Sequence, residues 1–246
     1  MTTTRFKKSG LRRVQNNMSP RPEPVVISFS GIDGSGKSTQ IERLSARLRK
    51  EQVAFVRFAF WDDIVPLAEP RSQFSRRILR GEQGVGTPEK PVQRSDKNVR
   101  RWYLTGLRAV LYGLDALCLR RAVAQARRKN LRLIVFDRYI YDQLANIPLN
   151  WLGRLYIQLV LRFVPAADIA LVLDAEPRAA LRRKPEYPLE FLEAYRQSYL
   201  DLQTLVPELV LVPAGDLETV ESRIWKAIDA HTSAVIPLGL KSPLAC

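Results

Sequence analysis

Apolar residues follow two patterns that alternate along the chain. Short runs rich in Val, Ile and Leu predict buried strands at 25–30, 53–60, 131–137, 168–174 and 208–213. Apolar residues three or four positions apart predict helices at 37–51, 99–129, 149–163, 177–183, 190–206 and 217–231. Because strands and helices alternate, the pattern favours an α/β domain with a five-stranded parallel sheet and helices on both faces.

In other segments the apolar residues do not recur at the spacing of a helix or a strand. Residues 1–22 are basic and end among prolines, which predicts a disordered tail. This segment has no apolar core for a secretory signal, and its Ser, Thr and Arg content only faintly resembles a transit peptide. Residues 61–96 predict an irregular region with a short basic helix at 73–79, and residues 232–246 a loose C-terminal tail. We therefore expect one domain over residues 23–231.

The composition of the chain indicates the charge of its expected binding partner. The 246 residues are 46% hydrophobic and 26% charged, which excludes a disordered chain, and 39 Lys and Arg against 25 Asp and Glu leave a net charge of +14. That excess favours an anionic partner. Only two cysteines are present, so we expect a reducing, cytoplasmic location. Charges interrupt the most apolar stretches, 104–119 and 149–164, so we expect no membrane span.

The most specific motif follows the first predicted strand. Residues 31–38, G-I-D-G-S-G-K-S, match the phosphate-binding pattern G-x-x-x-x-G-K-[ST]. Its glycines let backbone amides turn toward phosphate oxygens at the start of a helix. Lys37 can reach the β- and γ-phosphates of ATP, and the Ser38 hydroxyl can ligate Mg²⁺. The residues expected to contact ATP are Gly31, Asp33, Gly34, Ser35, Gly36, Lys37, Ser38 and Thr39.

Three segments resemble the thymidylate kinase family of nucleoside monophosphate kinases. They are the run I-S-F-S-G-I-D-G-S-G-K-S-T-Q at 27–40, V-F-D-R-Y at 135–139, and D-I-A-L-V-L-D at 168–174. The resemblance implies a three-layer P-loop kinase fold with a small lid, here at about 182–190. It also implies a homodimer and phosphoryl transfer from MgATP to a nucleoside monophosphate, in the first place dTMP.

The same resemblance implies residue roles. Asp33 would contact the sugar of the acceptor, Asp137 would organise Mg²⁺ and its waters, and Arg138 would bind phosphate between donor and acceptor. The phosphate-binding motif contains no arginine, so a lid arginine, Arg182 or Arg183, is expected to serve the donor, with Arg183 favoured for catalysis. The plainer interpretations are a surface ion pair at a strand end and solvated cations at a helix end. The expected catalytic residues are Lys37, Asp137, Arg138 and Arg183.

The expected acceptor helix departs from the family pattern. The family carries an aromatic that stacks on the base and, four residues later, an arginine that reads thymine. Counting back from the Asp-Arg-Tyr segment places Tyr112 at the aromatic position and Ala116 at the arginine position. Alanine cannot hydrogen-bond to a base, and a register that uses Arg108 instead needs a helix about two turns longer.

The segment after the second predicted strand also departs. Where the family has an Arg-Glu-Pro-Gly-Gly segment that holds the acceptor phosphate, this chain has R-F-A-F-W-D-D at 57–63. Either Arg57 or Arg71 could supply the phosphate contact. Residues 61–63 could line an altered acceptor pocket or form an ordinary loop with a packed tryptophan.

The spacing and number of the remaining candidate residues indicate structural rather than catalytic roles. Tyr195 and Tyr199 are four apart and share one helix face, which is typical of core packing. A single histidine and two distant cysteines give no support to a zinc site.

Two alternatives to a dTMP kinase stay open. The same machinery could act on another nucleotide or a phosphorylated metabolite, or the chain could bind ATP or nucleic acid without catalysis. No nucleic-acid-binding motif accompanies the positive charge, so we expect no specific nucleic-acid partner.

Overall fold

The computed structural model of the chain describes residues 23–65 and 102–235, and of residues 102–108 and 232–235 only the backbone. The N-terminal tail, the short helix predicted at 73–79 and most of the predicted C-terminal tail lie outside these residues. The first four residues of the predicted C-terminal tail are helical, because the last helix ends at Val235.

Five parallel strands form the predicted sheet. They are β1 (Val25–Ser30), β2 (Phe55–Ala59), β3 (Leu133–Asp137), β4 (Ile169–Asp174) and β5 (Leu209–Pro213). Their order is β2-β3-β1-β4-β5, with Ile27 of β1 paired to Val135 on one side and Ile169 on the other. The fold class expected from the sequence is confirmed. Connections leave the central strand in both directions, and ligands bind at the carboxyl ends of strands in such sheets.

The six longer helices predicted within the described residues are present. They are α1 (Lys37–Lys50), α4 (Trp102–Arg127), α6 (Trp151–Phe163), α7 (Pro177–Arg183), α8 (Leu189–Gln203) and α9 (Leu217–Val235). Two short elements were not predicted: a π-helical turn, η1 (Phe60–Ile64), and α5 (Ile140–Leu144). Each has five residues, which is too short for an apolar period to identify.

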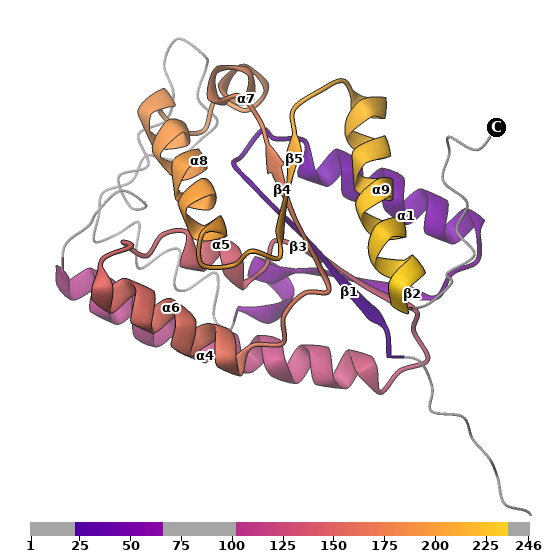
Figure 1. Cartoon of the computed structure of the whole chain (residues 1–246), viewed down its shortest axis with the longest axis horizontal. Coiled ribbons are helices and arrows are strands. Elements are labelled where there is room, and N and C mark those ends of the chain that lie inside the picture. The colour runs from indigo at the N-terminus through magenta and orange to yellow at the C-terminus, as the bar shows by residue number, and fades with distance from the viewer. Residues whose placement is uncertain (1–22, 66–101, 236–246) are drawn as a thin grey trace, which may run out of the picture.

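Alternating strand residues build a core on each face of the sheet. Ile27 and Phe29 pack with α1 and α9, whereas Val26 packs with α4, α5, α6 and α8. Figure 1 shows α1 beside α9, with α4 and α6 crossing the opposite end of the molecule. Both strand residues facing α1 are fully buried, and burying a side chain of this size contributes about 1.5–3 kcal/mol. The two cores fix the carboxyl ends of β1, β2 and β3 relative to one another.

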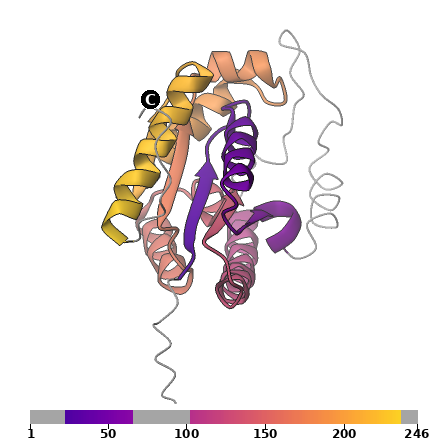
Figure 2. The same cartoon turned by 90° about the vertical axis from the view of Figure 1, so that its right-hand side faces the viewer.

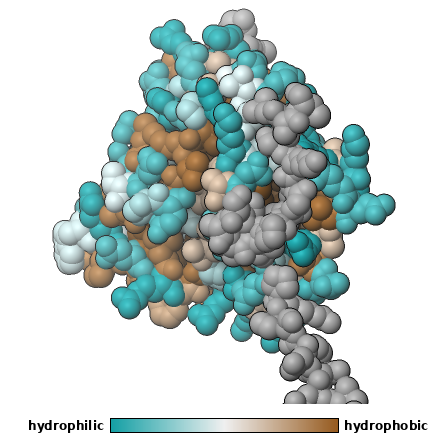
Figure 3. All heavy atoms as spheres, turned by 45° about the vertical axis from the view of Figure 1, so that its right-hand side comes forward, coloured by the Kyte–Doolittle hydropathy of each residue, from teal (hydrophilic) through white to brown (hydrophobic). Residues whose placement is uncertain are grey.

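The outer face of α4 and α6 stays apolar. These two helices lie against each other, seen nearly end-on in Figure 2. Their exposed apolar residues are Val110, Leu114, Leu117, Trp151, Leu152, Leu155, Leu159 and Phe163. Elsewhere, on the face of the molecule drawn in Figure 3, hydrophilic side chains separate smaller apolar patches. Among the helices described, none is long and apolar enough to cross a lipid bilayer.

Candidate functional site

The loop of residues 31–36 joins the central strand β1 to the first turn of α1. Gly31, Gly34 and Gly36 have φ angles of 133°, 81° and 92°, a region that side chains with a Cβ rarely adopt. A Cβ on Gly34 would also lie 2.4 Å from the carbonyl oxygen of Ala180 in α7. Glycine is therefore required both by the turn and by the contact between this loop and α7.

The Lys37 side chain is buried inside this loop. Its Nζ donates hydrogen bonds to the carbonyl oxygens of Gly31 and Ile32, each at 2.8 Å, and lies 3.4 Å from the Ser35 Oγ. Burial lowers the pKa of Lys37 from 10.5 to about 8, and the charge of Arg138 adds to that shift. The loop thus holds a lysine whose charge depends on pH within an ordinary experimental range.

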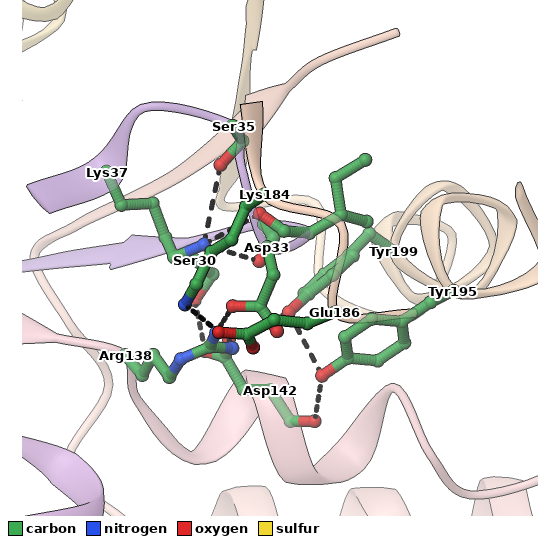
Figure 4. A network of polar contacts seen from close by, with 12 residues as sticks. Ser30, Asp33, Ser35, Lys37, Arg138, Asp142, Lys184, Glu186, Tyr195 and Tyr199 are labelled. Atoms are coloured by element: carbon green, nitrogen blue, oxygen red, sulfur yellow. Dashed lines mark hydrogen bonds and ion pairs between the residues drawn. The ribbon is translucent and has the colours of Figure 1, made fainter. Parts of the chain in front are cut away.

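Arg138 follows β3 and points toward the loop. Its φ of 68° is unusual for a residue other than glycine. One guanidinium nitrogen pairs with Asp33 of the loop, and NH1 lies 3.0 Å from Oδ1 of Asp142 in α5 (Figure 4). Burial alone would lower the pKa of Arg138, but the two carboxylates outweigh it and hold this pKa well above its usual value. Arg138 is therefore a fixed cation at the carboxyl edge of the sheet.

Asp137 is held from behind by a residue of the neighbouring strand. Its Oδ2 accepts a hydrogen bond from NH2 of Arg57 in β2 at 3.2 Å, and the other end of Arg57 pairs with Glu42 of α1. Burial would lower the pKa of Arg57, but hydrogen bonds to Glu42 and Asp137 raise it above its usual value. Arg57 thus orients the Asp137 carboxylate and does not itself line the pocket described next.

A pocket of about 420 Å³ lies over these residues. Nine of the residues singled out from the sequence line it: Asp33, Gly34, Gly36, Lys37, Ser38, Thr39, Asp137, Arg138 and Arg183. The remaining two residues of the motif prediction, Gly31 and Ser35, contribute oxygens that surround the Lys37 amine. Segments far apart in sequence therefore meet around a single cavity of nucleotide-site size.

The opposite wall of the pocket comes from the end of β2. It consists of Ala59, Phe60, Trp61 and Asp62. Trp61 packs edge-to-face on Phe60, with ring centroids 5.4 Å apart, yet stays 38% exposed. Asp63 instead folds back, its Oδ2 accepting the backbone N–H of Ala59 at 2.6 Å. Trp61 and Asp62 therefore line the described pocket and Asp63 does not, while binding of the acceptor at this wall stays a prediction.

The two candidate lid arginines differ in position. NH1 of Arg183 donates to the Gly34 carbonyl at 3.0 Å, and Arg183 and Lys184 line the pocket. Lys184 also pairs with Glu186 at 3.1 Å. Both arginines are exposed, but Arg182 is not among the pocket residues. Of the two, only Arg183 therefore lines the pocket, and its catalytic role stays a prediction.

The expected base-binding residues lie apart from the described pocket. Tyr112 is half-buried against the core, and Ala116 is buried in that core on α4. The alternative arginine, Arg108, has no described side chain, and Arg71 lies outside the described residues. The acceptor-side predictions at Tyr112 and Arg71 therefore stay predictions.

The oxygen donors around the pocket fit magnesium. Within residues 23–65 and 102–235, no three His, Cys, Asp or Glu side chains are grouped to hold a metal ion. The Ser38 hydroxyl and the Asp137 carboxylate both line the pocket. Mg²⁺ is typically bound by one or two protein oxygens together with phosphates and waters, so this sparse oxygen set suits it.

Sequence reasoning missed the buried carboxylate beneath Arg138. Asp142 is fully buried and accepts hydrogen bonds from Ser30 Oγ at 2.7 Å and from Tyr199 at 2.7 Å, besides its contact with Arg138. The available signal was an acidic residue one helical turn after the arginine, an i,i+4 spacing. The core packing predicted for the two tyrosines of α8 is present, but both hydroxyls also reach Asp142.

Two similar proteins and a similar solved structure are named thymidylate kinases. No protein-family model matches the chain. The "Probable thymidylate kinase" of Methanosphaera stadtmanae is 26% identical over 200 residues, covering 80% of this chain and 92% of the relative. The "Putative thymidylate kinase" of Aeropyrum pernix is 30% identical over 189 residues, covering 73% and 79%. The solved structure of the thymidylate kinase from Candida albicans shares the fold, with a TM-score of 0.56, 18% identity, and coverage of 85% of this chain and 93% of that one.

Proposed function

Since this chain belongs to the thymidylate kinase family, we propose that it transfers the γ-phosphoryl group of ATP to dTMP, forming dTDP and ADP. One observation of the structure supports this most directly: Lys37, Arg138 and Arg183, from three separate elements, line one pocket. Phosphoryl transfer needs little covalent help from the protein. It needs two substrates held in line and a charge that is neutralised as it develops, which cations around a closed site provide.

The glycine loop of residues 31–36 would bind the phosphate donor, ATP. Its backbone N–H groups and the N-terminus of α1 favour the phosphates of ATP, with Lys37 beside them. Arg183 reaches the loop from α7 and would neutralise charge on the transferred group. Ser38 and Asp137 would hold Mg²⁺, which when bound neutralises charge on the β- and γ-phosphate oxygens.

The acceptor side belongs to Arg138 and the end of β2. Arg138 lies between the loop and α5, where its guanidinium can bind the phosphate of the nucleoside monophosphate. Asp33 pairs with Arg138, so a sugar contact by Asp33 would come in addition to that pair. Trp61 and Asp62 form the wall that the acceptor nucleotide would meet. Arg57 orients Asp137, and Arg138 rather than Arg57 would bind the acceptor phosphate.

The test is ADP formation with MgATP and a panel of acceptors. We expect turnover with dTMP above that with dUMP, UMP, CMP, AMP and GMP, and loss of at least about a hundredfold in Lys37→Ala. Lys50→Ala, at an exposed position of the same helix, should keep the wild-type rate. Absence of turnover with every nucleotide would overturn the proposal.

A second candidate function is the same transfer to another acceptor. One observation favours it: Ala116, at the position expected for the thymine-reading arginine, is buried in the core. Alanine cannot hydrogen-bond to a base, so this position cannot select thymine. Faster turnover with another member of the panel than with dTMP would support this candidate over the first.

The apolar face of α4 and α6 supports a further proposal, that two copies of the chain pair through it. Its exposed leucines, valine and aromatics lie on adjacent helices, and a symmetric pair would cover both copies at once. Leu155→Glu should then yield a monomer in sedimentation velocity, while Ala194→Glu, which adds the same charge at an exposed position of α8, should leave the dimer intact. A monomeric wild-type protein would contradict the pairing.

We also propose a cytoplasmic location, which fractionation of cells would test.

A further inference from the structure

Asp142 is a buried carboxylate with four hydrogen-bond donors around it. Oδ2 accepts from Ser30 Oγ at 2.7 Å and from the backbone N–H of Tyr139 at 3.1 Å. Oδ1 accepts from NH1 of Arg138 at 3.0 Å and from the Tyr199 hydroxyl at 2.7 Å. The donors come from β1, the turn after β3, and α8, so one side chain joins three parts of the fold (Figure 4).

We propose that Asp142 is a positioning residue that orients the Arg138 guanidinium toward the acceptor phosphate, with Tyr199 of α8 fixing the Asp142 carboxylate in turn. This inference rests on the proposed function. Asp33 holds the other end of the guanidinium from the glycine loop. With a carboxylate at each end, the planar guanidinium has a defined orientation in the lining of the pocket.

The burial of this carboxylate makes its contacts strong. Asp142 is fully buried and Arg138 nearly so, and a buried charge that loses a partner is destabilised far more than an exposed one. The tyrosine hydroxyls stay protonated and able to donate, because burial raises the pKa of Tyr199 and of Tyr195 well above the usual value for tyrosine. Both hydroxyls therefore remain hydrogen-bond donors to Asp142 at neutral pH.

Two tyrosines provide a matched comparison. Tyr199 donates to the Asp142 carboxylate, whereas Tyr195, one helical turn earlier, donates to the Asp142 backbone carbonyl at 2.9 Å. Removing either hydroxyl leaves the ring in the same packed helix. Tyr195→Phe also removes the 3.2 Å contact between the two hydroxyls, but only Tyr199→Phe removes a contact from the carboxylate that holds Arg138. A structural role for both hydroxyls would affect stability in both variants and would not separate kcat from KM.

The experiment measures dTMP kinase kinetics, thermal unfolding, and modification of Arg138 by phenylglyoxal, read by peptide mass spectrometry. We expect Asp142→Asn to lower kcat about a hundredfold and Tyr199→Phe about tenfold, with the KM for ATP within twofold of wild type. Arg138 should react faster with phenylglyoxal in both variants. Tyr195→Phe should keep kcat within twofold and leave the reactivity of Arg138 unchanged.

Three outcomes would overturn the proposal: equal kcat in Tyr199→Phe and Tyr195→Phe, a loss of stability without loss of kcat, or unchanged phenylglyoxal reactivity of Arg138. Should Asp142→Asn fail to fold, the tyrosine pair decides alone. The modification assay needs no catalysis. A wild-type protein without dTMP kinase activity would therefore contradict the proposed function, while the reactivity of Arg138 would still report on its orientation.

Discussion

The wall of the pocket built by residues 31–39 depends on backbone geometry, whereas the wall built by residues 59–62 depends on side chains. In the first, three glycines with positive φ and a buried lysine leave little freedom of residue type. In the second, Trp61 and Asp62 are exposed side chains on a short π-helical turn. π-Helical turns often occur at functional sites.

Under the proposed function, the wall built by residues 31–39 is the donor wall and the wall built by residues 59–62 is the acceptor wall. Phosphate oxygens are the same in every nucleotide, and the donor wall would bind them with backbone groups and fixed cations. The acceptor base and sugar vary, and exposed side chains on a turn can be replaced without disturbing the core. Substitutions on the donor wall should therefore abolish activity, and substitutions on the acceptor wall should alter selectivity.

Replacing the lid arginine should have the largest effect. We expect Arg183→Ala to lower kcat about a thousandfold, because a positioned arginine neutralises charge that develops on the transferred phosphoryl group. Steady-state kinetics with saturating ATP and dTMP measures this. Arg182→Ala is the matched control: it lies outside the pocket and should stay within about twofold. Equal losses in both variants would contradict the distinction between the two arginines.

Adding a methyl group to the glycine loop should destabilise the fold itself. In Gly34→Ala the new Cβ meets a backbone carbonyl of α7 and the residue keeps a positive φ, so we expect a loss of about 1–3 kcal/mol in the free energy of unfolding. Urea denaturation measures it. Gly113→Ala, in α4 with open space around its Cβ, should be neutral or more stable. A Gly34→Ala protein as stable as wild type would show that the loop can move away from α7.

Removing the aromatic side chain of the acceptor wall should have a smaller effect. We expect Trp61→Ala to raise the KM for dTMP about tenfold, the scale of a lost base–aromatic contact, and to leave the KM for ATP unchanged. Trp61→Phe should recover most of the affinity. Binding of dTMP should also quench the fluorescence of Trp61 in the wild-type protein. A change in the KM for ATP alone would place Trp61 on the donor side instead.

The smallest effect should be a pH dependence from the donor wall. Burial lowers the pKa of Lys37 to about 8, so the amine is charged below that pH and loses its proton above it. We expect kcat/KM for ATP to fall several-fold between pH 8 and pH 9. In Lys37→Arg the guanidinium stays charged, so the falling limb should disappear even if the rate is lower. A limb that persists in Lys37→Arg would belong to another group.

The sequence alone predicted the donor wall better than the acceptor wall, for physical reasons. A loop that needs glycine at fixed positions can be recognised as a motif in the amino-acid sequence, and runs of apolar residues identify every strand of the sheet. Counting along a helix placed Ala116 at the position of the family's thymine-reading arginine, and only the structure shows that this residue is buried in the core. Asp142 was missed because its importance arises from contacts with β1 and α8, which lie far away in sequence. The contact between Arg57 and Asp137 likewise comes from the neighbouring strand, since Asp137 of β3 pairs with Ala59, two residues beyond Arg57 in β2.

The pairing of arginines with carboxylates has a consequence for how the chain meets its substrates. Arg138 is balanced by two aspartates and Arg57 by an aspartate and a glutamate, so the surplus of +14 resides elsewhere in the chain. Charges distributed over a surface attract anions at a distance but are screened within about 8 Å at physiological ionic strength. Added salt should therefore slow the encounter with nucleotides, while the lifetime of the bound complex, set by the compensated cations within the pocket, changes little.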